Sequence, residues 1–183
     1  MSIEQYLWQQ ISKGDKESYA EVYRGLFPRF YNHGHKFTSD SLLVEDAAQE
    51  ALVLLWERRE KLPGIKNVET YYYAVYRNNL FAAIRKQQLL AGEQELPETP
   101  EFSIESVIIS GESEVLRSAE LQAALKTLTS RQLEAIFLRF YEGFSYEEVS
   151  EMLGITVKST YKIVARALAL LKENMLVQLM LCF

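Results

Sequence analysis

Cysteine and histidine are nearly absent from this chain of 183 residues. The only cysteine is Cys182, and the only histidines are His33 and His35. A single cysteine excludes an internal disulfide and a cysteine-rich metal site. The two histidines are separated by one residue and stand near no acidic cluster, so we expect them in surface or loop positions without a metal role.

The residue combinations of common catalytic sites are also missing. The sequence has no phosphate-binding glycine loop, no cluster of metal-ligand residues, and no set of serine, histidine and aspartate at catalytic spacing. We therefore predict that the protein is not an enzyme.

Long apolar runs and strand patterns are scarce. The apolar end of the chain, residues 175–183, is far shorter than the ~20 residues of a membrane helix. Residues 1–10 lack the apolar segment of a signal peptide. We therefore expect a cytoplasmic protein without membrane insertion. The only β-like run is residues 107–109, and helical spacing dominates elsewhere, which predicts an all-α protein.

The net charge of −5 is concentrated in one short stretch. Residues 1–90 carry 12 basic and 11 acidic side chains, and residues 117–183 carry 8 and 7. Residues 91–116, in contrast, carry seven glutamates, two of the four prolines and no lysine or arginine. This composition predicts an extended, flexible acidic linker. The linker divides the chain into two small helical domains, residues 1–90 and 117–183.

Residues 145–166 have the pattern of a helix-turn-helix. Ser145 and Glu148 predict a capping box at the start of the first helix. Gly154 stands where a left-handed residue ends a helix, and Thr156 can cap the next one. The apolar face of that second helix is predicted to consist of Val157, Thr160, Tyr161, Val164, Leu168 and Leu171.

The second helix of this pair also carries a basic stripe. Lys158, Lys162 and Arg166 follow one another at four-residue spacing, which places them on one helix face. Such a face is typical of a helix that enters the DNA major groove. Any helical hairpin with a solvated basic flank is the simpler alternative.

Residues 41–59 predict a helix with an acidic first half and an apolar second half. Glu45, Asp46 and Glu50 lie near its start, where the helix dipole alone explains acidic residues. Residues 52–56 are apolar without interruption, which is wider than one buried stripe. Part of this helix should therefore contact a protein partner that accepts both acidic and apolar side chains.

Residues 70–88 predict a third informative helix, which follows a loop at residues 62–67. One side is expected in the core: Tyr73, Tyr76, Leu80 and Ile84. The other side interleaves aromatic, amide and basic side chains: Tyr71, Val75, Asn78, Asn79, Ala82, Arg85 and Lys86. This mixture suits stacking on unpaired bases, and the loop could form a pocket for an extruded base. A tyrosine-rich core helix with a solvated basic end explains the pattern equally well.

These segments together resemble the extracytoplasmic-function (ECF) sigma factors of bacteria. Residues 43–56, with an acidic pair, a Gln-Glu pair and a closing tryptophan, resemble the family's core-binding helix. Residues 71–86 look like its promoter-melting helix, and residues 128–155 are similar to its second domain. This chain also departs from the family at three positions. The family usually has tryptophan where Tyr71 stands and aspartate where Ala82 stands, and arginine is common where Ile163 stands.

The resemblance implies a sigma factor that directs core RNA polymerase to specific promoters and initiates transcription. The first domain would bind the β′ clamp helices through Glu45, Asp46, Gln49, Glu50, Leu52, Val53 and Trp56. It would recognise and melt the −10 element through Asn67, Tyr71, Val75, Asn78, Ala82, Arg85 and Lys86. The second domain would meet the β flap and read the −35 element through Thr156, Val157, Lys158, Ser159, Lys162 and Arg166.

The resemblance also implies an anti-sigma factor as a partner. It implies no cofactor, because the polymerase supplies the chemistry. The apolar tail of residues 175–183 would either extend the last helix or contact that partner. Two other functions fit the same residues. A stand-alone helix-turn-helix regulator would bind promoter DNA without polymerase, and an interaction protein would bind polymerase without reading DNA.

Overall fold

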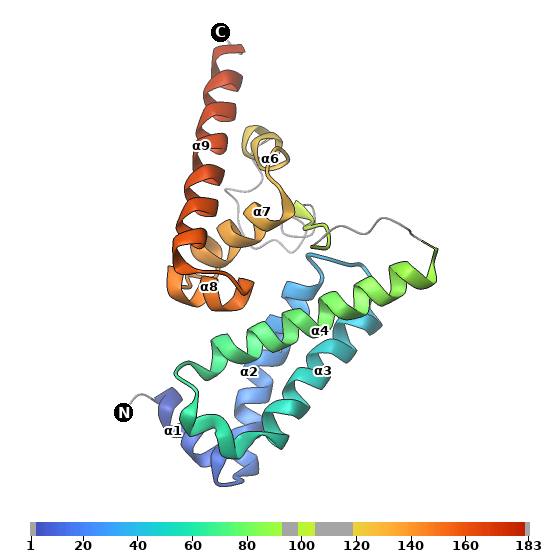
Figure 1. Cartoon of the computed structure of the whole chain (residues 1–183), viewed down its shortest axis with the longest axis vertical. Coiled ribbons are helices and arrows are strands. Elements are labelled where there is room, and N and C mark those ends of the chain that lie inside the picture. The colour runs from blue at the N-terminus through green and yellow to red at the C-terminus, as the bar shows by residue number, and fades with distance from the viewer. Residues whose placement is uncertain (1–2, 93–98, 105–118, 182–183) are drawn as a thin grey trace. The chain divides into compact units, whose positions relative to one another are not determined.

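The computed structural model describes residues 3–92, 99–104 and 119–181. Within these residues the secondary structure is helical and no strand is present, which confirms the all-α prediction. The chain forms two compact units, Met1–Leu96 and Pro97–Phe183 (Figure 1). Cys182 and the β-like residues 107–109 lie outside the described residues.

Within its described residues, 3–92, the first unit contains four α-helices and one 3₁₀ helix. Their bounds are Ile3–Ser12 for α1, Lys16–Gly34 for α2, Ser41–Glu57 for α3, Arg59–Gly64 for the 3₁₀ helix and Val68–Leu90 for α4. The three long helices begin at side-chain caps, because Asp15, Asp40 and Asn67 each accept a hydrogen bond from the backbone N–H three residues later. Helix α1 was not predicted from the sequence.

The core of the first unit is aromatic, as the predicted inner side of α4 suggested. Tyr73, Tyr76, Leu80 and Ile84 are all buried. The ring of Phe30 in α2 stacks in parallel on Tyr76 with 4.6 Å between centroids. Burial of aromatic rings in such pairs contributes about 0.5–1.5 kcal/mol beyond their area.

His33 belongs to this core, so its predicted surface position was wrong. It lies in the last turn of α2 and is buried. Its ring meets Tyr73 edge-on at 4.8 Å and Phe37 at 5.2 Å. Its position in the α2 helix therefore places this imidazole among aromatic rings.

The second unit contains four α-helices among its described residues. They are α6 (Ala119–Leu125), α7 (Ser130–Ile136), α8 (Tyr146–Leu153) and α9 (Val157–Leu181), with a π-helical segment at Phe137–Tyr141. Helix α7 opens with the capping box of Thr129 and Gln132. The backbone of α9 continues to Leu181, so the apolar tail extends the last helix.

Part of the predicted extended linker packs on the second unit. Phe102 and Ile104 are buried. The backbone N–H of Phe102 donates to Ser130 Oγ at 3.1 Å, and the Phe102 ring lies 5.8 Å from that of Phe137. These two apolar side chains anchor the chain just before the residues 105–118, which lie outside the described part.

Candidate functional site

The acidic residues predicted to bind polymerase lie on an open face of α3. Asp46, Gln49 and Glu50 are exposed, and Glu45 is half-buried. Gln49 Nε2 donates a hydrogen bond of 3.0 Å to Glu45 Oε1. Asp46 and Glu50 are four residues apart, so both carboxylates point to the same side of the helix.

A groove of about 340 Å³ lies between α3 and α4 beside these carboxylates. Its lining combines acidic and apolar side chains: Asp40, Leu42, Leu43, Asp46, Ala47 and Glu50 from α3 and its cap, and Asn79 and Ala83 from α4. Gln87 Nε2 of α4 donates to Asp40 Oδ2 at 2.9 Å. The sequence did not predict that Asp40 and Ala83 line a groove, because the groove forms only when the two helices lie side by side.

The apolar half of α3 is divided between core and surface. Leu52 is fully buried, so the prediction that its side chain contacts a partner was wrong. Helices α2 and α4 both pack on α3, and the Tyr19 hydroxyl donates to the Leu52 carbonyl at 3.0 Å. Val53 is 52% exposed and remains available.

Trp56 is half-buried at the end of α3. Its ring lies 5.0 Å from that of Tyr19, and the Arg59 guanidinium lies 4.8 Å from the ring centroid. Arg59 Nη1 also donates to the Trp56 carbonyl at 3.0 Å. The indole is therefore fixed in place with part of its surface open.

The outer side of α4 presents most of the residues predicted to meet the −10 element. Tyr71 is 39% exposed, and Asn78, Ala82, Arg85 and Lys86 are also exposed. Val75 is half-buried between them. No acidic residue occurs from Tyr71 to Gln88, so this side keeps an uncompensated positive charge.

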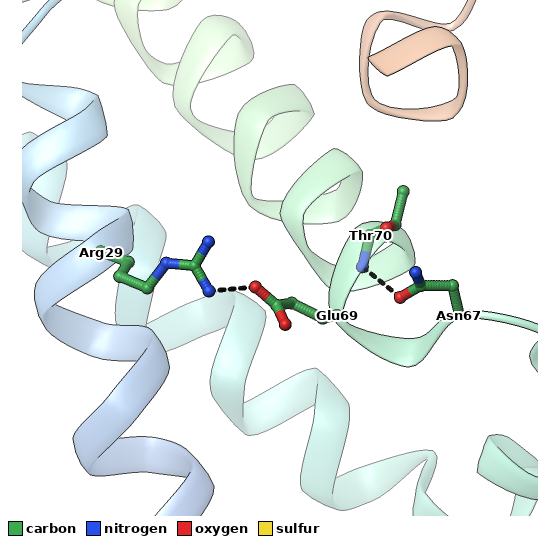
Figure 2. A network of polar contacts seen from close by, with 4 residues as sticks. All are labelled: Arg29, Asn67, Glu69 and Thr70. Atoms are coloured by element: carbon green, nitrogen blue, oxygen red, sulfur yellow. Dashed lines mark hydrogen bonds and ion pairs between the residues drawn. The ribbon is translucent and has the colours of Figure 1, made fainter. Parts of the chain in front are cut away.

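The start of α4 is fixed by two polar contacts (Figure 2). Asn67 Oδ1 accepts a hydrogen bond of 3.0 Å from the Thr70 N–H, so this predicted DNA contact also caps the helix. Glu69 forms an ion pair with Arg29 of α2. These contacts set the position from which Tyr71 projects.

The helix-turn-helix predicted from residues 145–166 is present in the second unit. The Ser145–Glu148 capping box is complete, with Ser145 N–H to Glu148 Oε2 at 2.7 Å and Glu148 N–H to Ser145 Oγ at 3.2 Å. Gly154 has φ +63°, the left-handed conformation expected of it. Thr156 Oγ1 accepts from the Ser159 N–H at 3.2 Å and caps α9.

The basic stripe of α9 is open to solvent. Lys158, Lys162 and Arg166 are all exposed, as is Thr156, whereas Val157 and Ser159 are half-buried. The Thr156 and Ser159 hydroxyls lie 2.9 Å apart and hydrogen-bond to each other. The buried side of the helix consists of Thr160, Val164 and Ala167. The stripe therefore points away from the core of the unit.

Two residues predicted for the apolar face of α9 lie on the surface instead. Tyr161 is 50% exposed, and Leu168 is exposed as well. The Tyr161 ring stacks on Tyr146 of α8 with 3.9 Å between centroids and 17° between planes. The Arg139 guanidinium lies 5.0 Å from the Tyr146 ring. Helical periodicity predicted Tyr161 in the core. The period of one helix cannot reveal that the ring stacks at the surface on a residue of another helix.

Family models match both units. The Sigma-70 region 2 model matches residues 22–89, and the Sigma-70, region 4 model matches residues 118–171. The chain belongs to the extracytoplasmic-function sigma factors. The region 2 match contains α3 and all of α4 except Leu90, and the region 4 match contains the helix-turn-helix.

Curated relatives agree with this family. The sigma factor is 24% identical to the RNA polymerase sigma factor YlaC of Bacillus subtilis (strain 168) over 171 residues, which cover 87% of this chain and 93% of YlaC. It is 26% identical to the RNA polymerase sigma-E factor of Streptomyces avermitilis, with 90% of this chain and 89% of that protein covered.

Two solved structures share the fold. RpoE of Bartonella quintana, solved with the anti-sigma factor NepR, matches with a TM-score of 0.61 at 20% identity over 88% of this chain and 98% of RpoE. CnrH, solved with the cytosolic domain of CnrY, matches with a TM-score of 0.60 at 16% identity. The match covers 92% of this chain and 94% of CnrH.

The described residues offer neither a metal site nor a membrane-spanning helix. No group of three or more His, Cys, Asp or Glu side chains there could hold a metal ion. None of the helices in that part of the sigma factor is long and apolar enough to cross a membrane.

Proposed function

We propose that the two units of this sigma factor divide the work of promoter recognition. The first unit binds core RNA polymerase and opens the −10 element, and the second reads the −35 element. The observation that supports this best is the orientation of α9. Lys158, Lys162 and Arg166 are exposed, whereas Thr160, Val164 and Ala167 are buried on the other side of the capped helix.

The polymerase contact is assigned to the acidic face of α3. Asp46, Gln49 and Glu50 are exposed, Glu45 is held beside Gln49, and Val53 adds apolar surface. Carboxylates beside apolar side chains suit a partner helix that carries both basic and apolar residues, because opposite charges steer and align the two surfaces. We assign that partner to the β′ clamp helices of polymerase. Trp56 lies at the end of the same helix.

The −10 element is assigned to the outer side of α4. Tyr71 offers a ring on which an unpaired base can stack, and Asn78 offers an amide that can hydrogen-bond a base edge. Arg85 and Lys86 are exposed about two helical turns beyond Asn78. Their charges can pair with the DNA backbone. Asn67, Val75 and Ala82 complete the assigned surface.

The −35 element is assigned to the first turns of α9. In a helix-turn-helix the second helix lies in the major groove, and its N-terminal residues meet the base edges. Thr156, Val157, Lys158, Ser159, Lys162 and Arg166 form this assigned surface. Because the stripe holds only three cations, we expect α9 to depend on polymerase for most of its affinity. The β flap is the assigned polymerase contact of the second unit.

An anti-sigma factor is the other proposed partner. RpoE of Bartonella quintana was solved with the anti-sigma factor NepR, and it shares this fold. A sigma factor works where polymerase and chromosome are, so we assign this one to the cytoplasm. We propose no cofactor and no catalytic step, since the chemistry of transcription belongs to polymerase.

Run-off transcription tests this proposal. The full chain would be combined with core polymerase and a pool of genomic promoter fragments, and the RNA products would be sequenced. We expect discrete start sites that are absent without the sigma factor. Duplex binding of equal strength without core polymerase would favour a stand-alone regulator. Polymerase binding without new start sites would favour an interaction protein.

A further inference from the structure

The stack of Tyr146 on Tyr161 joins the two helices of the helix-turn-helix at the surface. The centroids of the two rings are 3.9 Å apart, and the rings are nearly parallel at 17°. Tyr161 is nevertheless 50% exposed. None of the described residues forms a hydrogen bond with its hydroxyl. The ring is therefore held by α8 while its polar atom stays available.

Tyr161 borders the basic stripe of α9. It follows Lys158 by three residues and precedes Lys162 by one. Side chains three residues apart are neighbours on a helix surface. Tyr161 thus lies on the edge of the stripe that is next to α8, at the junction of the two helices.

Arg139, in the π-helical segment that precedes α8, also contacts this pair of rings. Its guanidinium lies 5.0 Å from the Tyr146 ring and 5.6 Å from the Phe140 ring. Its Nη1 also donates to the Phe144 carbonyl at 3.1 Å. Arg139 thereby fixes Tyr146, and Tyr146 fixes Tyr161. A side chain that is already fixed loses little conformational freedom when it binds.

We propose that the Tyr161 hydroxyl donates a hydrogen bond to a DNA phosphate at the edge of the major groove. This inference rests on the proposed function, in which α9 lies in the groove. The first helix of such a motif crosses the DNA backbone while the second occupies the groove. A side chain at their junction is therefore placed beside phosphates, and tyrosine hydroxyls are among the usual phosphate donors.

The contact has a signature that separates it from the lysine contacts. A hydroxyl carries no charge, so it displaces no counterion from DNA. The variant Tyr161→Phe keeps the ring and its stack but loses the donor. We expect it to weaken binding roughly three- to tenfold without changing the salt dependence. Lys158→Ala should instead reduce the slope of log affinity against log salt by about 1.

The experiment measures binding of the full chain with core polymerase to the promoter fragment that it transcribes best. The matched control is Tyr6→Phe, because Tyr6 is 49% exposed and lies in α1 of the first unit. We expect Tyr6→Phe to bind like the unmodified protein. If Tyr161 had a purely structural role, Tyr161→Phe would also bind DNA like the unmodified protein, because the stacked ring is retained.

Methylphosphonate linkages identify the acceptor. Each such linkage replaces one charged phosphate oxygen by a methyl group. A linkage at one position should abolish the difference in affinity between the unmodified protein and Tyr161→Phe. If Tyr161→Phe binds normally while Lys158→Ala binds weakly, the tyrosine contact is overturned and the proposed function stands. If neither change affects binding, α9 does not read DNA and both fail. A loss that no linkage abolishes would assign the hydroxyl to a base and overturn the phosphate contact.

Discussion

Gly34 at the end of α2 lies directly against the hydroxyl of Tyr76 in α4. A Cβ atom on Gly34 would overlap Tyr76 Oη and would lie 2.6 Å from Val44 Cγ1 in α3. Tyr76 is fully buried, and this burial raises the pKa of its hydroxyl well above the usual value. Three helices therefore meet where only a hydrogen atom fits.

We expect Gly34→Ala to destabilise the first unit by about 1–3 kcal/mol, because an added methyl group in a packed core forces its neighbours apart. Gly25→Ala on the same helix is the matched control, since nothing lies within 4 Å of its added Cβ. Alanine there should stabilise α2 by about 0.5–1 kcal/mol. Urea unfolding followed by tryptophan fluorescence measures both, because Trp8 and Trp56 both belong to the first unit. Equal stability of the two variants would contradict this packing.

The N-terminal cap of α3 makes stability depend on pH. Hydrogen bonds from the Leu43 N–H and then from the Gln87 amide lower the pKa of Asp40. A carboxyl whose pKa is lowered by folding adds stability above its unfolded pKa of about 3.9. That stability is lost as the pH falls through the folded pKa. We expect Asp40→Asn, which keeps a capping oxygen, to lose less stability than the unmodified protein between pH 7 and pH 3. Urea midpoints at the two pH values give the comparison, and identical shifts would refute the role of the charge.

The acidic face of α3 predicts a charge-dependent polymerase contact. Reversing both charges in Asp46→Lys, Glu50→Lys should weaken binding to core polymerase about tenfold or more, because like charges would then face each other. Both residues are exposed, so the unfolding midpoint should change little. The control double variant is Glu17→Lys, Glu21→Lys, which reverses two exposed charges on α2. Equal co-purification of both double variants with polymerase would argue against this assignment.

Local features of the fold were predictable because a few neighbouring residues determine them. Both capping boxes, at Thr129 and Ser145, depend on side chains three residues apart. The left-handed Gly154 likewise follows from its position after an apolar helix. The predicted core side of α4 was correct because four apolar or aromatic residues share one helical period.

Features that depend on contacts between helices were not predictable in the same way. Leu52 and Val53 are neighbours in one apolar run, yet one is fully buried and the other is 52% exposed. Only the packing of α2 and α4 on α3 decides between them. Tyr161 was placed in the core by its period, but the buried side of α9 is made of the smaller residues Thr160, Val164 and Ala167. The groove beside Asp46 also exists only once α4 is in place.

Tyr71 gives a test of promoter melting on α4. Its ring is 39% exposed and meets Tyr72 edge-on at 5.1 Å. Stacking of a base on an aromatic side chain contributes about 1–3 kcal/mol. Tyr71→Ala should therefore lower the yield of open complex by roughly tenfold, whereas Tyr71→Trp should retain it. Permanganate reactivity of unpaired thymines measures melting, and wild-type reactivity in Tyr71→Ala would exclude the stacking role.

The basic stripe of α9 gives the test of sequence reading. Lys158→Ala and Lys162→Ala should each reduce initiation from the cognate promoter and lower the salt dependence of promoter binding by about one counterion. Lys172→Ala is the matched control, because Lys172 is exposed on the same helix about three turns beyond Lys162. Only the first turns of such a helix reach base edges, so the control should initiate normally. If all three variants retained the same initiation and salt slope, α9 would not be the helix that reads the −35 element, and the exposure of its lysines would reflect solvation alone.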